Sequence, residues 1–282
     1  MKFHQDTAEI FIPDGLASEK ALRRTTHLAI SAHMDDIEIM ATEPILRCYQ
    51  QPDLWLSAIV MTDGRTSPRD DLYKDYSDED MRLVRIKEQK KAAVIGEYTT
   101  LVLLDYPSQV IKDPKDKRTI EDLQLILSKM SPQFVYTHNL ADKHHTHVST
   151  ALRVIEALRH LPIDKRPKKL YGCEVWRSLD WLLDNEKVTF DLSAHENLQS
   201  ALLGIYDSQI CGGKRYDLAT MGRRKANATY FESHDVDTFQ GLSFGMDLTP
   251  LIEDDKKSIN DFVQEHIGRF AQVVADSLTR LG

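Results

Sequence analysis

The residues 32–38, AHMDDIE, bring a histidine and two aspartates together within four positions. His33, Asp35 and Asp36 directly follow the apolar residues Leu28, Ala29 and Ile30, so they are expected at the turn that leaves a strand. A strand end in an open α/β sheet points into the crevice where ligands bind. Imidazole and carboxylate groups are good Zn²⁺ ligands, and a carboxylate that stays off the metal can serve as a base for water.

A second cluster, residues 142–147 with the sequence DKHHTH, supplies further ligand groups after another short apolar run. If His144 opens a helix, His147 lies about one turn later on the same face. One of these two histidines can then bind a metal while the other faces a substrate. His33, Asp36 and His147 together would leave one position open for water, which is typical of catalytic rather than structural zinc.

Simpler interpretations of each cluster remain open at this point. An aspartate pair after a strand often only caps a helix, and a histidine-rich hexamer can be a solvated loop. Two clusters with complementary ligands, placed at the ends of two separate strands, favour the metal site.

These clusters, with two segments between them, resemble the PIG-L/LmbE-like zinc de-N-acetylases, which act on N-acetylglucosamine conjugates. AHMDDIE is similar to the family's AHPDD(I/E)E, and TDG at residues 62–64 is similar to its T-x-G. Residues 85–96 resemble its R-x-x-E helix that ends in (L/I)-G, and DKHHTH is similar to D-x-H-P-D-H. The four segments follow the family order over about residues 25–160. A weaker similarity to the family's SQ segment lies at residues 207–209.

The resemblance implies a role for each matching residue. His33, Asp36 and His147 correspond to the zinc ligands, and Asp35 corresponds to the general base. His144 corresponds to the residue that stabilises the oxyanion or donates a proton.

Two further positions, Arg85 and Asp142, enter the expected site less directly. Arg85 resembles the family arginine that contacts the sugar, although a surface arginine on an amphipathic helix fits the same pattern. Asp142 is a candidate to orient a histidine ligand through its free ring nitrogen. Met34 replaces the family's proline and His145-Thr146 replaces its Pro-Asp, but none of these corresponds to a ligand, so the chemistry is expected to survive.

The sequence therefore predicts an enzyme, a metal-dependent amide hydrolase that removes an N-acetyl group from an N-acetylglucosamine-type conjugate. The expected cofactor is Zn²⁺, with another divalent metal as an alternative. Two other functions stay open, an amidase for a glucosaminyl thiol conjugate and a non-catalytic sugar-binding protein of the same fold. A dinucleotide-binding protein is disfavoured, because the first turn has no glycine and its two carboxylates would repel phosphate.

Composition is that of an ordinary soluble enzyme. The 282 residues carry a net charge of -8, which argues against nucleic acid as the main partner. The three cysteines are far apart, so neither a disulfide framework nor a cysteine-zinc site is expected. No apolar run approaches the roughly 20 residues of a membrane helix, so no membrane insertion is expected. The acidic start, broken by Pro13 and Gly15, does not resemble a signal peptide, and a cytoplasmic protein is expected.

Short β-rich runs alternate with helical patterns, which predicts an α/β fold with a Rossmann-like, mostly parallel sheet and flanking helices. Strands are expected near 26–32, 55–62, 98–104, 133–137 and 169–176, and helices near 78–95, 118–130 and 145–160. Residues 1–176 would form the metal-binding core, and 177–282 a smaller C-terminal α+β extension packed on the same domain.

Within the extension we expect a strand near 187–192 and helices near 195–209 and 214–233. The final apolar stripe, from Ile259 to Val274 at helical spacing, is expected to pack against the core or a subunit, which makes a homo-oligomer possible. The polar segment 64–77 is expected to be a loop that carries specificity.

Overall fold

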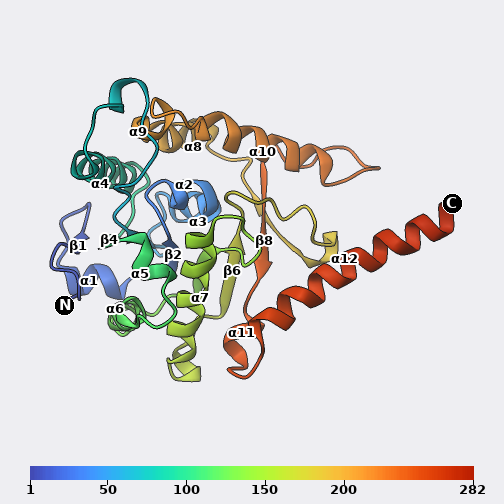
Figure 1. Cartoon of the computed structure of the whole chain (residues 1–282), viewed down its shortest axis with the longest axis horizontal. Helices are drawn as coiled ribbons and strands as arrows, with labels where there is room; N and C mark the ends of the chain where they lie inside the picture. Colours follow the sequence, from blue (N-terminus) through green and yellow to red (C-terminus); the bar gives the residue numbers. More distant parts are fainter.

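The apolar runs of the sequence form strands of a single mixed sheet in the computed structural model, which describes residues 1–282 (Figure 1). The strands are β1 (Glu9–Phe11), β2 (His27–Ser31), β3 (Leu56–Thr62), β4 (Thr100–Tyr106), β5 (Phe134–His138), β6 (Lys169–Cys173), β7 (Lys187–Asp191) and β8 (Leu242–Asp247). Their order across the sheet is β1-β4-β3-β2-β5-β6-β8-β7.

The central strands β4, β3, β2, β5 and β6 are parallel, whereas β1, β8 and β7 pair antiparallel at the two sides. From β2 the chain moves outward to β3 and β4, then returns to add β5 and β6 on the other side of β2. Strand order thus reverses between β2 and β5, which is the place where open α/β sheets bind ligands.

Helices surround the sheet, and their bounds follow in chain order. They are α1 (Ser18–Arg23), α2 (Asp36–Met40), α3 (Thr42–Cys48), α4 (Asp78–Ile95), α5 (Ser108–Lys112), α6 (Arg118–Leu127), α7 (His145–Arg159), α8 (Glu196–Gly204), α9 (Asp207–Ile210), α10 (Tyr216–Tyr230), α11 (Pro250–Glu253) and α12 (Ile259–Leu281). No helix is both long and apolar enough to cross a membrane.

Side chains of the central strands alternate between two hydrophobic cores, one on each face of the sheet. Leu28 and Ile30 of β2 join a core with α6 and α7, whereas Ala29 joins a core with α2, α3, α4 and α8. Every residue of β2, β3 and β4 is buried, as expected for strands of a parallel sheet that is covered on both faces. The packing holds the strand ends, and so the loops that follow them, in fixed positions.

The predicted α/β class and the mostly parallel sheet are confirmed. The expected helix 78–95 is present with the same bounds, because Ser77 and Asp80 form a capping box at its start. The predicted helix 195–209 is wrong in one respect: the chain breaks at residues 205–206 into α8 and α9. The strands β1 and β8 were not predicted, since one has three residues and the other contains a glycine that weakens the strand pattern.

Of the two partners expected for the final apolar stripe, the core contacts only the start of the stripe. Only Phe262 is buried, and Figure 1 shows α12 projecting away from the sheet toward the C-terminus.

Candidate metal and active site

The turn after β2 holds its shape through hydrogen bonds to the two neighbouring strands β5 and β3 and through one bond within the turn. The backbone N–H of Ala32 donates to Nε2 of His138 at 2.8 Å, and the hydroxyl of Thr62 donates to the carbonyl of Ala32 at 2.8 Å. The N–H of His33 donates to Oδ2 of Asp36, also at 2.8 Å. The ends of β2, β3 and β5 are therefore tied together where the first sequence cluster begins.

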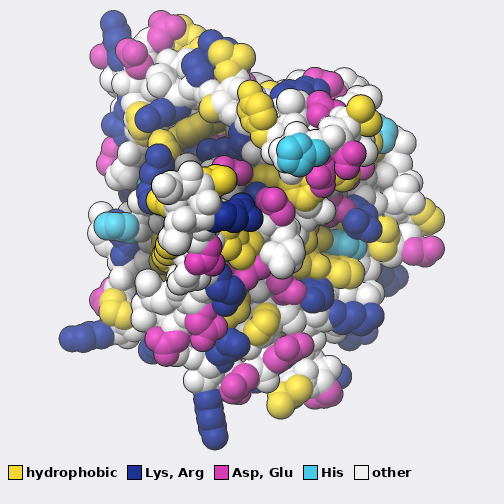
Figure 2. Space-filling model, turned by 90° about the vertical axis from the view of Figure 1, so that its right-hand side faces the viewer, with side chains coloured by type: hydrophobic (Ala, Val, Ile, Leu, Met, Phe, Trp, Pro, Cys, Tyr) yellow, Lys and Arg dark blue, Asp and Glu magenta, His cyan; other side chains and the backbone are white.

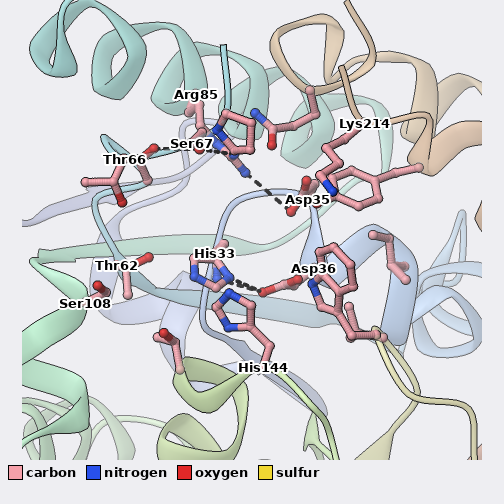
Figure 3. A pocket seen from close by; sticks show the side chains of 18 of the residues that line it. His33, Asp35, Asp36, Thr62, Thr66, Ser67, Arg85, Ser108, His144 and Lys214 are labelled. Atoms are coloured by element: carbon pink, nitrogen blue, oxygen red, sulfur yellow. Dashed lines mark hydrogen bonds and ion pairs between the residues drawn. The ribbon is translucent and has the colours of Figure 1, made fainter. Parts of the chain in front are cut away.

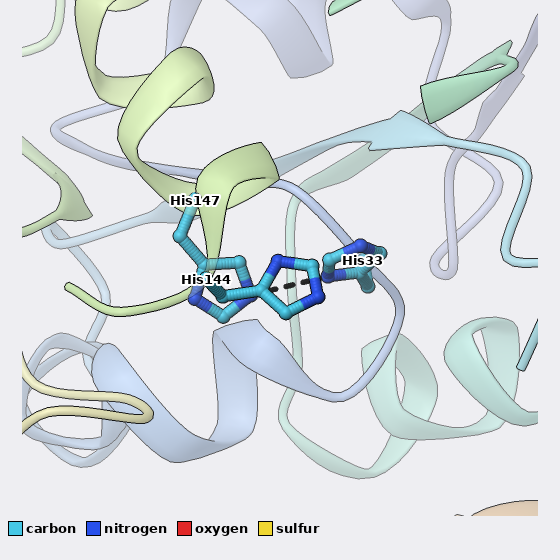
Figure 4. A group of neighbouring side chains, drawn as sticks. All are labelled: His33, His144 and His147. Atoms are coloured by element: carbon cyan, nitrogen blue, oxygen red, sulfur yellow. Dashed lines mark hydrogen bonds between the residues drawn. The ribbon is translucent and has the colours of Figure 1, made fainter. Parts of the chain in front are cut away.

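Three of the predicted site residues meet at this point. Nδ1 of His33 lies 3.1 Å from Oδ2 of Asp36 and 3.2 Å from Nε2 of His147. Oδ2 of Asp36 lies 3.4 Å from Nε2 of His147, which closes a nearly equilateral triangle. Figure 4 shows the imidazole rings of His33 and His147 directed toward each other, with His144 beside them.

This triangle fits a tetrahedral metal ion. Ligand atoms about 2.0–2.1 Å from a zinc ion lie about 3.3 Å from one another, close to the three separations found here. The set contains two imidazole nitrogens and one carboxylate oxygen, which are donor types that zinc takes in proteins. The structure thus has His and Asp donor atoms able to hold a divalent metal, in this triangle and in the overlapping groups of His33, His144 and His147 and of Asp36, His138 and His147.

Asp142 supports this group from behind. Its Oδ2 lies 3.6 Å from Nδ1 of His147 and accepts the backbone N–H of Trp176, while Oδ1 accepts the N–H of His144. Both Asp142 and His147 are buried. The carboxylate is therefore placed to orient His147, as carboxylates often do behind metal-binding histidines.

His138, the last residue of β5, is a site residue that the sequence did not reveal. Its ring stacks on that of His147 with centroids 3.9 Å apart, and its Nε2 lies 3.5 Å from Oδ2 of Asp36. Because Nε2 already accepts the N–H of Ala32, His138 packs beneath the ligand triangle and secures the turn. The sequence did not indicate His138 as a site residue, because it belongs to a strand and lies outside the DKHHTH segment.

His144 and His145, at the start of α7, have different surroundings. His144 is half-buried beside the triangle, with its ring centroid 5.0 Å from that of His33, and it lines the cavity described below. His145 is exposed and does not line that cavity. The complete burial of His147 rules out a wholly solvated loop for this segment.

Asp35 stands at the start of α2 but does not cap it, because its side chain makes no capping hydrogen bond. Its φ of 87° is rare for a residue with a side chain, and conformations of this kind cost about 1–3 kcal/mol. Oδ1 of Asp35 lies 3.4 Å from Nη2 of Arg85 (Figure 3). The strained turn points Asp35 and Asp36 to different partners, since Asp36 joins the histidines.

Gln89 of α4 holds this turn from the side of the core. Its Oε1 accepts the backbone N–H of Asp35 at 3.2 Å, and its Nε2 donates to Oε1 of Glu38 at 2.9 Å. Glu38 also accepts the hydroxyls of Tyr98 and Tyr206, each at 2.6 Å. All four side chains are buried, so the backbone of Asp35 belongs to a closed polar network.

Arg85, the predicted sugar contact, lies at the wall of the site. It donates to the hydroxyl of Ser67 and to the carbonyl of Met34, and its charge faces Asp35. A Cβ at Gly64, where φ is 65°, would lie 3.1 Å from both Arg85 Cδ and Met34 Sδ. Glycine in the T-x-G segment therefore permits the close approach of Arg85 to the turn.

The two adjacent aspartates have opposite electrostatic environments. Burial raises the pKa of Asp35, although the nearby Arg85 guanidinium opposes this effect. Burial would also raise the pKa of Asp36, but His147 and His138 outweigh it and hold the pKa well below its ordinary value. Asp36 thus stays ionised as a ligand would, whereas Asp35 accepts a proton more readily.

Burial lowers the pKa of His144 to about 4, and the charge of His147 acts in the same direction. His144 is therefore a neutral imidazole near pH 7, with one N–H to donate.

A cavity of about 330 Å³ opens in front of these residues (Figure 3). Only four of its twenty lining residues are hydrophobic, so the wall suits a polar, hydroxyl-rich molecule. Besides His33, Asp35, Asp36, Arg85 and His144, the lining includes Gly64, Thr66, Ser67 and Pro68 from the polar loop, and Ser108 and Lys112 near α5.

The C-terminal third completes the wall with Gln209, Lys214 and Tyr216. Nζ of Lys214 lies 5.1 Å from the ring centroid of Trp176, and the rings of Trp176 and Tyr216 meet edge to face. Gln209 had a family signal in the sequence, as part of the DSQ segment. The other two come from a region without a recognisable motif.

Part of the chain matches a known protein family. Residues 28–158, which contain both clusters, match the family model PIG-L, described as GlcNAc-PI de-N-acetylase. The comparison with curated protein sequences gives no match.

Among solved structures, the chain is similar to the N,N'-diacetylchitobiose deacetylase of Pyrococcus horikoshii, with 16% identity, a TM-score of 0.64 and coverage of 84% of this chain and 88% of that one. It is also similar to the A40926 pseudoaglycone deacetylase, with 15% identity, a TM-score of 0.58 and coverage of 79% and 97%. A third similar structure is the 4-carboxy-2-hydroxymuconate hydratase of Pseudomonas putida, with 16% identity, a TM-score of 0.60 and coverage of 79% and 96%.

At these identities the similar structures support the fold, whereas the match over residues 28–158 spans the sequence segments that carry the site. The match over residues 28–158 and the shared fold together support the PIG-L/LmbE-like de-N-acetylase family.

Proposed function

We propose that the protein is a zinc-dependent hydrolase that removes the N-acetyl group from an N-acetylglucosamine-type conjugate and releases acetate and a free amine. The observation that carries the proposal is the triangle of His33, Asp36 and His147 donor atoms beside a second carboxylate, Asp35, that is not part of it. A binding protein has no need of such a carboxylate next to a metal.

His33, Asp36 and His147 would hold the metal in this proposal. A zinc ion bound there supplies Lewis-acid chemistry, because it lowers the pKa of water and polarises a carbonyl oxygen. Another divalent metal could bind to the same three ligands, so the proposed ligand set does not depend on the ion being zinc.

Asp35 acts as the general base. It takes a proton from the water that attacks the acetyl carbon, and its raised pKa favours holding that proton. The N–H of His144 donates to the carbonyl oxygen as negative charge develops there. The proton then passes from Asp35 or His144 to the departing nitrogen, and the C–N bond breaks.

The cavity wall supports a sugar as substrate. Hydroxyl groups need hydrogen-bonding partners, and the wall offers Thr66, Ser108 and Gln209 among others. The Trp176 ring provides a flat apolar surface of the kind that packs against a sugar ring. Arg85 lines the same cavity, so its expected contact with the sugar remains part of the proposal.

The test is a panel of N-acetylglucosamine conjugates in which acetate and free amine are both quantified. The proposal predicts equal amounts of the two products with the parent protein and release of both slowed about 10²-fold or more with Asp35→Asn. The panel should include a glucosaminyl thiol conjugate and 4-carboxy-2-hydroxymuconate. Amide cleavage only of the thiol conjugate would favour the amidase, and hydration of the muconate without acetate release would reject the hydrolase.

A further inference from the structure

The helix α12 leaves the body of the protein after its first two turns. Ile259 and Val263 pack partly against the core and Phe262 is buried there. From Ile267 to the end of the chain, every residue except Ser277 is exposed. Figure 1 shows this segment extending away from the sheet on the side where the C-terminus lies.

The exposed part of α12 carries an apolar stripe. Ile267, Phe270, Val274, Leu278 and Leu281 follow one another at intervals of three or four residues, which places them on one face of the helix. Their exposed fractions rise from 39% at Ile267 to 80% at Leu281. Intervals of three and four residues are typical of a helix that packs lengthwise against another helix.

The charged residues of α12 gather on the opposite face. Asp261, Glu265, Arg269, Asp276 and Arg280 are separated by four, four, seven and four residues, so they also share one face. Arg269 pairs with Glu186 of the body, and Asp276 accepts a hydrogen bond from Gln272. Charge is thus kept away from the apolar stripe.

We propose that the apolar stripe of α12 binds the same stripe of a second copy, with the two helices antiparallel and a twofold axis at Val274. This register places Ile267 opposite Leu281 and Phe270 opposite Leu278 of the partner. It also places the small residues Ala271 and Ser277 opposite each other, which lets the helices approach closely. No charged side chain is brought opposite a like charge, because all five lie on the outer faces.

The area fits an interface of modest strength. Five large apolar side chains that are 39% to 80% exposed form a patch on the order of a few hundred Å², which is comparable to the largest patch on a typical monomer. Two such patches would bury at most about 1,000 Å² in total, near the lower limit for specific protein interfaces. The dimer should therefore dissociate on dilution.

The charges of α12 do not fit a membrane surface as the partner. Helices that bind anionic membranes are rich in lysine and arginine on the polar face, whereas α12 has three acidic residues and two arginines. Figure 2 views the molecule from the side toward which α12 projects, and there too acidic side chains accompany the basic ones around the hydrophobic groups.

Sedimentation velocity at about 1–100 μM protein tests the association. The proposal predicts that the average mass of the parent rises from 32.3 kDa toward twice that value with concentration. Val274→Asp would place two carboxylates together at the axis and keep the protein monomeric. Gln272→Asp adds the same charge on the outer face and should associate as the parent does. Both positions are exposed, so thermal melting by circular dichroism should show that both variants remain folded.

The register is tested by oxidation of single-cysteine variants, with the parent as background for its three native cysteines. Val274→Cys should form a disulfide-linked dimer, whereas Ile267→Cys alone should not, and a mixture of Ile267→Cys with Leu281→Cys should form a mixed dimer. Efficient linking of Ile267→Cys to itself would reject the antiparallel register. A parent that stays at monomer mass throughout, or a Val274→Asp variant that still dimerises, would overturn the proposal. Binding to phosphatidylserine vesicles that Val274→Asp abolishes would instead assign the stripe to a membrane.

Discussion

At the residue scale, the site depends on two adjacent aspartates that share one chemistry but have different surroundings. Asp36 lies among histidines, and Asp35 lies against Arg85 in a strained turn. Neighbouring residues in an extended chain point in opposite directions, and the positive φ of Asp35 sends the next residue into α2. The backbone, and not the side-chain type, therefore separates a ligand from a base.

The ligand assignment predicts the metal content of three variants. His33→Ala, Asp36→Ala and His147→Ala should each bind less metal than the parent, because each removes one of three ligands. Metal content is measured on purified protein by mass spectrometry, and the His145→Ala variant should match the parent. Full metal content in all three ligand variants would show that the ion lies elsewhere.

The base assignment predicts that Asp35→Asn keeps its metal and loses turnover. Asparagine preserves the shape but cannot accept a proton, and loss of a general base typically lowers the rate about 10²- to 10⁴-fold. The measurement is kcat at saturating zinc, with bound metal quantified on the same sample. A near-parental kcat would mean that another group takes the proton.

His144 is tested against its neighbour. His144→Ala should keep zinc yet lose about 10²- to 10³-fold in kcat with a smaller change in KM, since an oxyanion contact strengthens only as charge develops. His145→Ala should behave as the parent, because His145 is exposed. If the effects of the two substitutions were exchanged, the assignment of this cluster would be off by one residue.

At the element scale, the site is positioned by α2, α4 and the C-terminal third together. Tyr206, which precedes α9, reaches Glu38 of α2, and Arg224 of α10 donates to the carbonyl of Glu38 and to the hydroxyl of Thr42. These contacts join segments more than 160 residues apart in the sequence, so no local pattern could have predicted them.

Substitution of Gln89 tests how α4 positions the turn that carries Asp35. Gln89→Leu removes the partner of the Asp35 N–H and of Glu38, and such buried unpaired groups cost about 1–3 kcal/mol. We expect a lower melting temperature and a kcat reduced about 10- to 100-fold by displacement of Asp35, with metal content retained. Lys87→Leu, an exposed position on the same helix, controls for the change in side chain. An unchanged kcat in Gln89→Leu would show that the turn keeps Asp35 in position without the hydrogen bond to Gln89.

The elements that the sequence predicted best are those with strong local signals. The helix 78–95 has a capping box, and the five central strands are apolar runs bounded by polar segments. The break between α8 and α9 comes directly after Gly204, a residue type common at helix ends, so the sequence held a local signal that the single predicted helix overlooked. A tertiary contact reinforces the break, since Tyr206 turns inward to Glu38.

At the scale of the whole molecule, the reversal of strand order between β2 and β5 explains why two clusters more than 100 residues apart meet. Parallel strands end at the same edge of the sheet, so the loops after β2 and β5 lie side by side. The sequence was sufficient to place both clusters at strand ends, and the adjacency of β2 and β5 then brought His33 and His147 together. It could not reveal His138, Lys214 or Tyr216, whose positions depend on the packing of distant segments.

The central claim is that one metal bound at this site enables amide hydrolysis. The most direct measurement is titration of the metal-free protein with zinc while bound metal and acetate release from an N-acetylglucosamine conjugate are followed together. We predict that the rate increases in proportion to bound zinc and reaches its plateau at about one ion per chain. A full rate in the metal-free protein, or bound zinc without any acetate release from the conjugates tested, would contradict the account.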